Sequence, residues 1–134
     1  LLPGALLRNR DRLFICKNVF IKPSTNNSAL TADLNLASAL KIPIAHAEGR
    51  FYADSDTLKK INDNDQVLFR YCNEKGYITD TANPNGALEN IAGVCNAEKN
   101  VFGMMPHPER AADDNLFNTD GKLLFESILN LVHA

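Results

Sequence analysis

Apolar residues occur in short runs that predict several strands. The runs Arg12–Lys22, Ile42–Ala45 and Gln66–Cys72 are rich in β-branched and aromatic residues, which pack well on a pleated surface. Arg12–Lys22 is also compatible with two strands of a hairpin, because Lys17 and Asn18 interrupt its apolar pattern. The chain should therefore contain at least three strands before residue 73.

Two further apolar runs, Ile91–Cys95 and Val101–Met105, flank the polar segment NAEKN. This arrangement predicts a β-hairpin. The residues at 46–56, HAEGRFYADSD, are predicted to form a loop, and Asn83–Gly86, NPNG, a turn.

Helical spacing of apolar residues predicts helices at Leu58–Ile61 and Lys122–Val132. The segment Ala29–Leu40 is ambiguous, because Leu30, Leu34 and Ala37 have helical spacing while Leu34 and Leu36 alternate as in a strand; we favour a short helix. Either Thr119 or Asp120 could cap the last of these, by placing a side-chain oxygen on the unpaired N–H groups of the first turn. The mixture of strands and a few helices indicates an α/β or α+β domain. A chain of 134 residues without repeats or linkers is expected to form one domain, 1–134.

Composition narrows the possible partners. The chain is 45% hydrophobic and 22% charged, with a net charge of −2, so it has no general attraction to nucleic acid or to an anionic membrane. No apolar run is long enough to span a bilayer, and no secretory leader is visible. Three cysteines cannot all pair and match no zinc spacing, which favours a reducing cytoplasm.

The segment Met104–Glu109, MMPHPE, places a histidine between two prolines directly after an apolar strand. The prolines favour extended backbone, in which residues two apart point to the same side. Glu109 could then accept the ring N–H of His107, the base and orienting acid of a nucleophilic triad. The alternative is a proline-rich turn with an ordinary surface histidine.

A second His-x-Glu pair, His46 and Glu48, follows another short strand. Two imidazoles with carboxylates raise the possibility of a metal-dependent hydrolase that uses both pairs. Spacing across unrelated loops does not constrain such ligands, so we expect no metal here.

None of the cysteines is expected to be a nucleophile. In the predicted hairpin, Cys95 lies roughly opposite Val101, and His107 is on the order of 20 Å away at ~3.3 Å per residue. A general base must come within about 3 Å of the thiol, or reach it through one water. Cys16 and Cys72 also lie in predicted strands, without the strand-to-helix turn that activates a cysteine.

Six segments occur in an order that resembles one family: LLPGALLRN, IPIAHAEGRFYAD, VLFRYCNEKG, NPNGALENIAGVCN, NVFGMMPHPERA and NTDG. The chain resembles the glutaminase subunits of phosphoribosylformylglycinamidine synthase, which are class I glutamine amidotransferases of purine biosynthesis. The resemblance covers nearly the whole chain and is weakest between Lys22 and Leu40. It implies a flavodoxin-like three-layer α/β/α fold, truncated at the N-terminus, with an antiparallel hairpin before the PHPE segment.

The resemblance also implies roles for particular residues. His107 and Glu109 match the histidine and glutamate of a Cys-His-Glu triad, and His46, Ala47 and Glu48 match the segment that lines the glutamine pocket. Position 47 is usually glycine in similar sequences. The family's nucleophile lies in a CNGFQ-like turn just before the counterpart of LLPGALLRN, so we expect it to be absent from this chain and the chain alone to be inactive.

Members of this family hydrolyse glutamine and pass ammonia to a synthetase subunit, which uses ATP to convert formylglycinamide ribonucleotide to its amidine. The implied partners are that synthetase subunit and a small accessory subunit. The implied cofactors, ATP and Mg, belong to the synthetase, so we expect none in this chain. The implied location is the cytoplasm. A non-catalytic binding or scaffold subunit is the alternative function.

Overall fold

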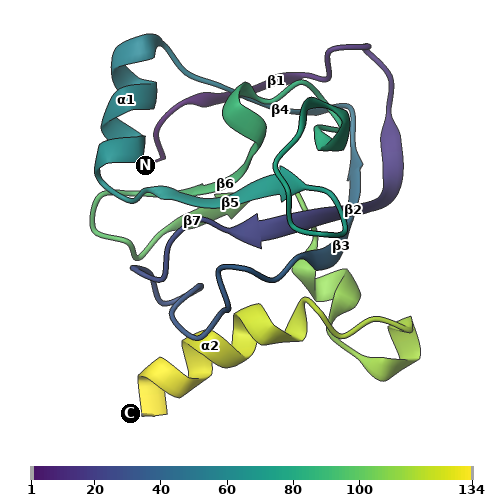
Figure 1. Cartoon of the computed structure of the whole chain (residues 1–134), viewed down its shortest axis with the longest axis vertical. Helices are drawn as coiled ribbons and strands as arrows, with labels where there is room; N and C mark the ends of the chain where they lie inside the picture. Colours follow the sequence, from purple (N-terminus) through teal and green to yellow (C-terminus); the bar gives the residue numbers. More distant parts are fainter. Residues whose placement is uncertain (1, 134) are drawn as a thin grey trace.

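The computed structural model describes residues 2–133, so the two ends of the expected domain, Leu1 and Ala134, lie outside the described residues. Its main element is a five-stranded sheet with the strand order β3-β2-β5-β6-β7 (Figure 1). The strands are β2 (Ile15–Pro23), β3 (Leu40–His46), β5 (Val67–Cys72), β6 (Ile91–Cys95) and β7 (Phe102–Met104). All three strands predicted before residue 73 are therefore present.

Two alternatives left open by the pattern are resolved by these strands. Ile15–Pro23 is one continuous strand and not a hairpin, because it pairs with β3 on one side and β5 on the other. The predicted hairpin at β6–β7 is confirmed, with Cys95 opposite Phe102 in place of Val101.

Every pairing between the described strands is antiparallel, whereas a flavodoxin-like fold would pair its strands in parallel. The short connection between β6 and β7 explains part of this difference, because parallel neighbours need a crossover of a dozen or more residues. The predicted mixture of strands and helices is nevertheless present.

The sheet curls so that its two outer strands approach each other at one end. Just after β7, Met105 N–H donates to Ala92 O of β6 at 3.1 Å. Two residues later, His107 N–H donates to Pro43 O of β3, on the opposite edge, at 2.8 Å. The segment that follows β7 therefore joins the two edges of the sheet.

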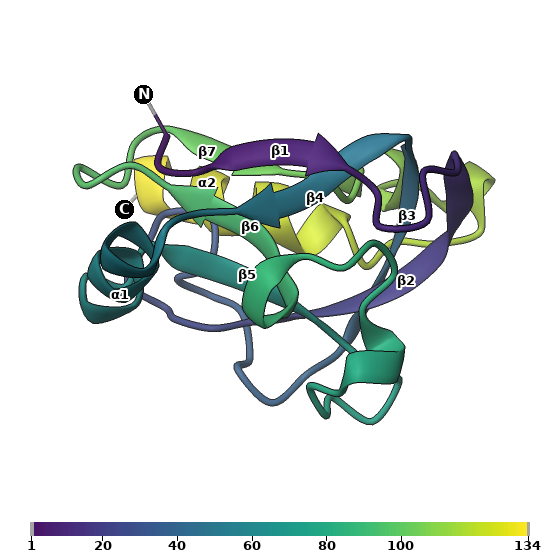
Figure 2. The ribbon, with the colours of Figure 1, turned by 90° about the horizontal axis from the view of Figure 1, so that it is seen from above.

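A two-stranded ribbon of β1 (Ala5–Arg8) and β4 (Glu48–Tyr52) lies on the side of the sheet away from the C-terminal helix (Figures 1 and 2). Residues 46–56 were predicted as a loop, and this prediction was wrong for most of that segment. The strand β4 forms because Gly49 and Phe51 are buried while Glu48 and Tyr52 are exposed, an alternation that the pairing with β1 makes stable.

Two α-helices are present among the described residues, α1 (Ser55–Asp63) and α2 (Lys122–His133), close to the predicted positions. Asp120 does not cap α2 with its side chain, because its carboxylate accepts the N–H of Lys41 at 2.7 Å. Four short 3-10 helices complete the secondary structure of the described chain: η1 (Asp80–Ala82), η2 (Leu88–Asn90), η3 (Pro108–Ala111) and η4 (Asp114–Leu116).

The helix predicted at Ala29–Leu40 is absent, and the segment forms successive turns. The amide of Asn26 donates to Thr31 O and Leu34 O, and these bonds hold the turns in place of helical ones. Ser127 of α2 donates to Ala29 O, which packs the segment against the C-terminal helix.

The core lies between the curled sheet and the elements that cover it. Its fully buried members include Ile21, Ile42, Phe69, Ile91 and Leu124, from four strands and α2. Within residues 2–133, no helix has both the length and the apolar character needed to cross a membrane.

Candidate active site

His107 and Glu109 form the contact predicted from their spacing. Nδ1 of His107 lies 2.9 Å from Oε1 of Glu109. The local backbone differs from the prediction, because Glu109 lies inside the 3-10 turn η3 and not in extended chain. Pro108 begins that turn, and its fixed φ suits a first helical position. The pair is therefore held by a proline-initiated turn.

The turn that carries this pair is fixed at both ends. On one side, the backbone of His107 is bound to Pro43 O of β3. On the other side, Gly121 N–H donates to Ala111 O at 2.7 Å, at the start of α2. A β-carbon at Gly121 would collide with the backbone of Pro108, so glycine is required for this close approach. The imidazole remains accessible, with about a third of the side chain exposed (32%).

His46 ends β3 and is almost fully buried, with 5% of its surface exposed. Its Nδ1 atom lies 2.9 Å from Oδ1 of Asn9, and its Nε2 atom is buried without a hydrogen-bond partner among the described residues. Burial lowers the pKa of His46, and the nearby positive charge of protonated His107 lowers it further. This direction favours the neutral form of the His46 imidazole at neutral pH.

The residues after His46 turn the chain from the sheet into the ribbon. Ala47 is exposed, and its carbonyl accepts the N–H of Asn9 at 2.9 Å. The carboxylate of Glu48 is exposed and contacts Nε of Arg8 at 3.3 Å, across the ribbon. The charge of His107 thus influences His46, whereas the structure directs Glu48 to an ion pair with Arg8.

Asn9 and Gly49 were not identified from the sequence as residues of the site. The side chain of Asn9 donates to His46 O and Leu13 O, each at 2.8 Å. The carbonyl of Gly49 accepts from Asn85, which lies in the predicted NPNG turn. Asparagines that bridge carbonyls have no period or spacing, so no signal in the sequence alone identifies them.

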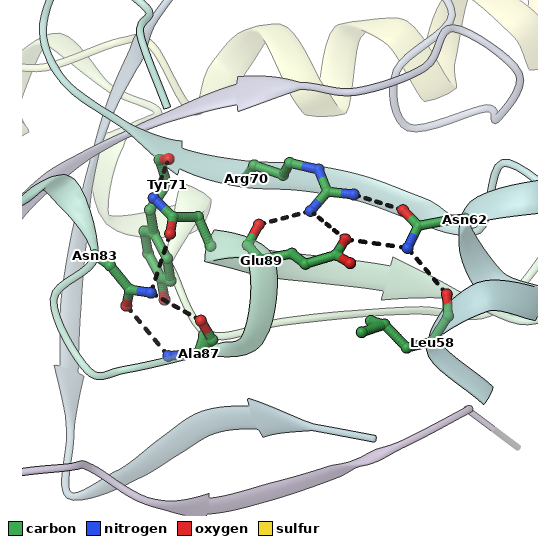
Figure 3. A network of polar contacts seen from close by, with 8 residues as sticks. Leu58, Asn62, Arg70, Tyr71, Asn83, Ala87 and Glu89 are labelled. Atoms are coloured by element: carbon green, nitrogen blue, oxygen red, sulfur yellow. Dashed lines mark hydrogen bonds and ion pairs between the residues drawn. The ribbon is translucent and has the colours of Figure 1, made fainter. Parts of the chain in front are cut away.

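Polar side chains make hydrogen bonds within and beside the loop that contains Asn85 (Figure 3). Arg70 of β5 donates from one guanidinium nitrogen to the carbonyl and carboxylate of Glu89, and from the other to Asn62 of α1. Asn83 donates to Ala87 O at 2.8 Å. The bonds of Arg70 connect β5 to α1 and to η2, and the bond of Asn83 closes the loop on itself.

The three cysteines differ in exposure. Cys72 and Cys95 are buried, and burial raises the pKa of Cys72 to about 11 and also raises the pKa of Cys95. Cys16 is exposed and opposite Ala45, so its side chain lies on the face of β3 away from His46.

No group of three histidine, cysteine, aspartate or glutamate side chains is placed to hold a metal ion within residues 2–133. Glu48 is engaged by Arg8, and one ring nitrogen of each histidine by Asn9 or Glu109. The four residues of the metal hypothesis are thus not arranged as one ligand set.

An apolar cleft of about 230 Å³ lies between the ribbon and the β6–β7 hairpin. Its lining includes Phe51, Ile91 and Met104, together with Gly49, whose other side faces the His46 ring. None of the described residues that line it is charged, so the polar groups suited to chemistry are those around His107 and not those of this cleft.

Comparison with known proteins identifies the family. Residues 3–122 match the model of the CobB/CobQ-like glutamine amidotransferase domain. The chain is 53% identical over all its 134 residues to phosphoribosylformylglycinamidine synthase subunit PurQ of Acaryochloris marina, and 51% identical over 130 residues to that of Aquifex aeolicus. The resemblance expected from the six segments is therefore confirmed.

A solved structure gives the same result for the fold. The chain superposes on a chain of the structure of PurLQS from Thermotoga maritima with a TM-score of 0.79 and 39% identity, over 98% of this chain and 54% of that one. The expected amidotransferase-like α/β fold is confirmed by this match. The chain spans 57% of the length of the Acaryochloris and Aquifex relatives.

Proposed function

The chain belongs to the CobB/CobQ-like glutamine amidotransferase family, and on that premise we propose that it is part of a glutaminase subunit of phosphoribosylformylglycinamidine synthase. The subunit hydrolyses glutamine and passes ammonia to a synthetase subunit. That partner uses ATP and Mg to convert formylglycinamide ribonucleotide to its amidine. The identity to two PurQ subunits supports this assignment.

The observation that carries the proposal is the contact between His107 and Glu109. A carboxylate on Nδ1 fixes the tautomer in which Nε2 is free to take a proton, and it stabilises the imidazolium that results. The tether to Pro43 and the packing of η3 on α2 hold the pair without further ordering. His107 is the general acid and base, and Glu109 orients it.

The reaction needs a thiolate that attacks the glutamine carboxamide carbon. His107 protonates the departing nitrogen, so that ammonia leaves and a thioester remains. Water then attacks the thioester with His107 as base, which releases glutamate and restores the thiol. None of Cys16, Cys72 and Cys95 fits the role of this nucleophile, so the 134 residues alone do not turn over glutamine.

His46, Ala47 and Glu48 are the proposed substrate-binding segment. The lowering of the pKa of His46 by the charge of His107 supports its part in this segment. Glu48 and Ala47 are exposed beside it, where they can contact a ligand at the surface. We place the complex, with its synthetase and small accessory subunits, in the cytoplasm. The likeness to a chain of the PurLQS structure from Thermotoga maritima supports these partners.

The proposal is tested by glutamine hydrolysis in the subunit that contains these residues, assembled with its synthetase partner. His107→Ala should lower kcat by about 10³ or more, and Glu109→Gln should also lower it strongly. His133→Ala at the end of α2 is the matched control and should leave the rate unchanged. A His107→Ala protein that keeps its full rate overturns the proposal.

A second measurement addresses the cysteines. The chain of 134 residues is incubated with a glutamine-mimicking diazoketone, and its intact mass is compared before and after. An unchanged mass supports the assignment of all three cysteines as non-nucleophilic. An adduct mapped to Cys16, Cys72 or Cys95 contradicts it.

A further inference from the structure

Asn9 makes hydrogen bonds to His46, Ala47 and Leu13. Its backbone N–H donates to Ala47 O at 2.9 Å, and its side-chain amide nitrogen donates to His46 O and Leu13 O. Asn9 is itself buried, with 1% of its surface exposed. Two of these bonds reach the end of β3, so Asn9 helps to fix the position of His46 and Ala47.

These bonds also determine which atom of Asn9 faces the imidazole. Because the amide nitrogen is engaged by two carbonyls, the oxygen Oδ1 must be the atom that lies 2.9 Å from Nδ1 of His46. An amide oxygen only accepts, so Nδ1 must carry a proton. The neutral ring then has its lone pair on Nε2.

The surroundings of the His46 ring oppose a flip of the imidazole. It packs directly on Gly49, where a β-carbon would come within 2.5 Å of Nδ1 and 2.8 Å of Cγ. A flipped ring would place a carbon against Oδ1 of Asn9 and lose the hydrogen bond. The Nε2 atom is buried and has no partner among the described residues.

We propose that Asn9 is a positioning residue that keeps the proton of His46 on Nδ1, so that the ring is neutral and its lone pair lies on the buried Nε2 atom. On the proposed function, on which this last step rests, the neutral ring leaves His107 free to take a proton. The tautomer itself does not depend on that function.

Neutrality of His46 serves the neighbouring base. During the proposed reaction His107 becomes an imidazolium, and a second positive charge on His46 would repel it. Asn9, which accepts a hydrogen bond but carries no charge, is suited to this purpose where a carboxylate is not.

The test is the protonation state of the His46 ring nitrogens, read by two-dimensional ¹⁵N NMR at neutral pH. In the unchanged chain we expect a protonated Nδ1 and an unprotonated Nε2. Free neutral imidazole side chains favour the opposite tautomer, so Asn9→Ala should move the proton of His46 to Nε2. Asn26→Ala is the matched control, because Asn26 also bridges two carbonyls but lies away from His46.

A second variant tests the charge argument. Asn9→Asp places a carboxylate opposite Nδ1 of His46. Position 9 lines a hollow whose other lining residues include four arginines, which keep this carboxylate ionised: Arg8, Arg10, Arg12 and Arg50. The NMR titration of His46 should then move to higher pH than in the unchanged chain.

The outcomes separate this proposal from the proposed function. A protonated Nε2 in the unchanged chain overturns it even if a variant fails to fold, and so does an Asn9→Ala protein that is folded and keeps the original tautomer. Absence of glutaminase activity in the assembled complex overturns the proposed function and leaves the tautomer result standing.

Discussion

The imidazole of His46 lies against the backbone of Gly49, three residues further along the chain, with no room for a β-carbon between them. Glycine is required here for space, because the backbone of Gly49 has no positive φ that would demand it. The same residue lines the apolar cleft on its other side. The absence of a side chain at Gly49 therefore allows β4 to pack directly on the buried His46 ring at the end of β3.

We predict that Gly49→Ala destabilises the fold by about 1–3 kcal/mol, because the added methyl must displace either the His46 ring or the backbone bonded to Asn85. Urea unfolding at constant pH measures the change. Gly103→Ala is the matched control, since its β-carbon would meet only the end of the flexible Leu2 side chain. Equal free energies of unfolding for the two variants would contradict this prediction.

The sequence predicted the contact between His107 and Glu109 but not the reason for it. The spacing and the prolines indicated that the two side chains could meet, and they do. The turn that holds them depends on Pro43 and Gly121, which are distant in sequence and have no motif of their own. Long-range hydrogen bonds of this kind are decided by the tertiary fold and not by local pattern.

We predict that the thiol of Cys16 reacts with iodoacetamide much faster than those of Cys72 and Cys95. Cys16 is exposed on β2, whereas the other two are buried and burial raises the pKa of each, which removes thiolate at neutral pH. Peptide mapping after brief labelling of the folded chain should find the label on Cys16 alone. Rapid labelling of Cys95 without denaturant would show that β6 opens or that its environment activates the thiol.

We predict that protonation of His46 destabilises the folded state in mildly acidic solution. Its pKa is lowered from the ordinary 6.5 by burial and by His107, so the unfolded chain binds this proton more readily than the folded one. The stabilising contribution is therefore complete above pH 6.5 and is lost as the pH falls through the lowered pKa. Besides burial, the charge of His107 lowers this pKa, and the hydrogen-bonded Asn9 adds no charge.

The measurement compares the free energy of unfolding in urea at pH 7.5 and at pH 5 for the unchanged chain and for His46→Gln. The unchanged chain should lose more stability between these two values, because the glutamine cannot take up a proton. Asp54, whose pKa is lowered chiefly by the backbone N–H of Thr57, loses its contribution only below the ordinary aspartate value of 3.8. Identical pH dependence in the two proteins would exclude His46 as the source.

Errors in the predicted fold have a common physical cause. The helix expected at Ala29–Leu40 and the loop expected at 46–56 both follow local pattern, but the amide of Asn26 fixes the first segment and pairing with β1 fixes the second. Tertiary contacts also decide the structure of η2, where Glu89 and Asn90 adopt positive φ values of 48° and 57°. Non-glycine residues take this conformation only where surrounding contacts fix it.

Arg70 supplies such contacts for η2. Its side chain is largely buried, with 16% exposed, and donates to Glu89 O at 2.6 Å and to Oδ1 of Asn62 at 2.6 Å (Figure 3). We predict that Arg70→Lys destabilises the fold by about 1–3 kcal/mol, although the charge is retained. One ammonium cannot reproduce the two directions of the guanidinium, so a carbonyl or an amide oxygen loses its donor.

The matched control for Arg70 is Lys59, which forms an exposed ion pair with Asp63 one turn along α1. Lys59→Ala should change the free energy of unfolding by about 0.5 kcal/mol or less, because exposed pairs of this type contribute little. Urea unfolding of both variants at one pH makes the comparison. Suppose that Arg70→Lys lowers the free energy of unfolding no more than Lys59→Ala does. The guanidinium then does not hold the strained turn η2, and the loop that contains Asn85 must depend on the contacts of Asn83 and Asn85 instead.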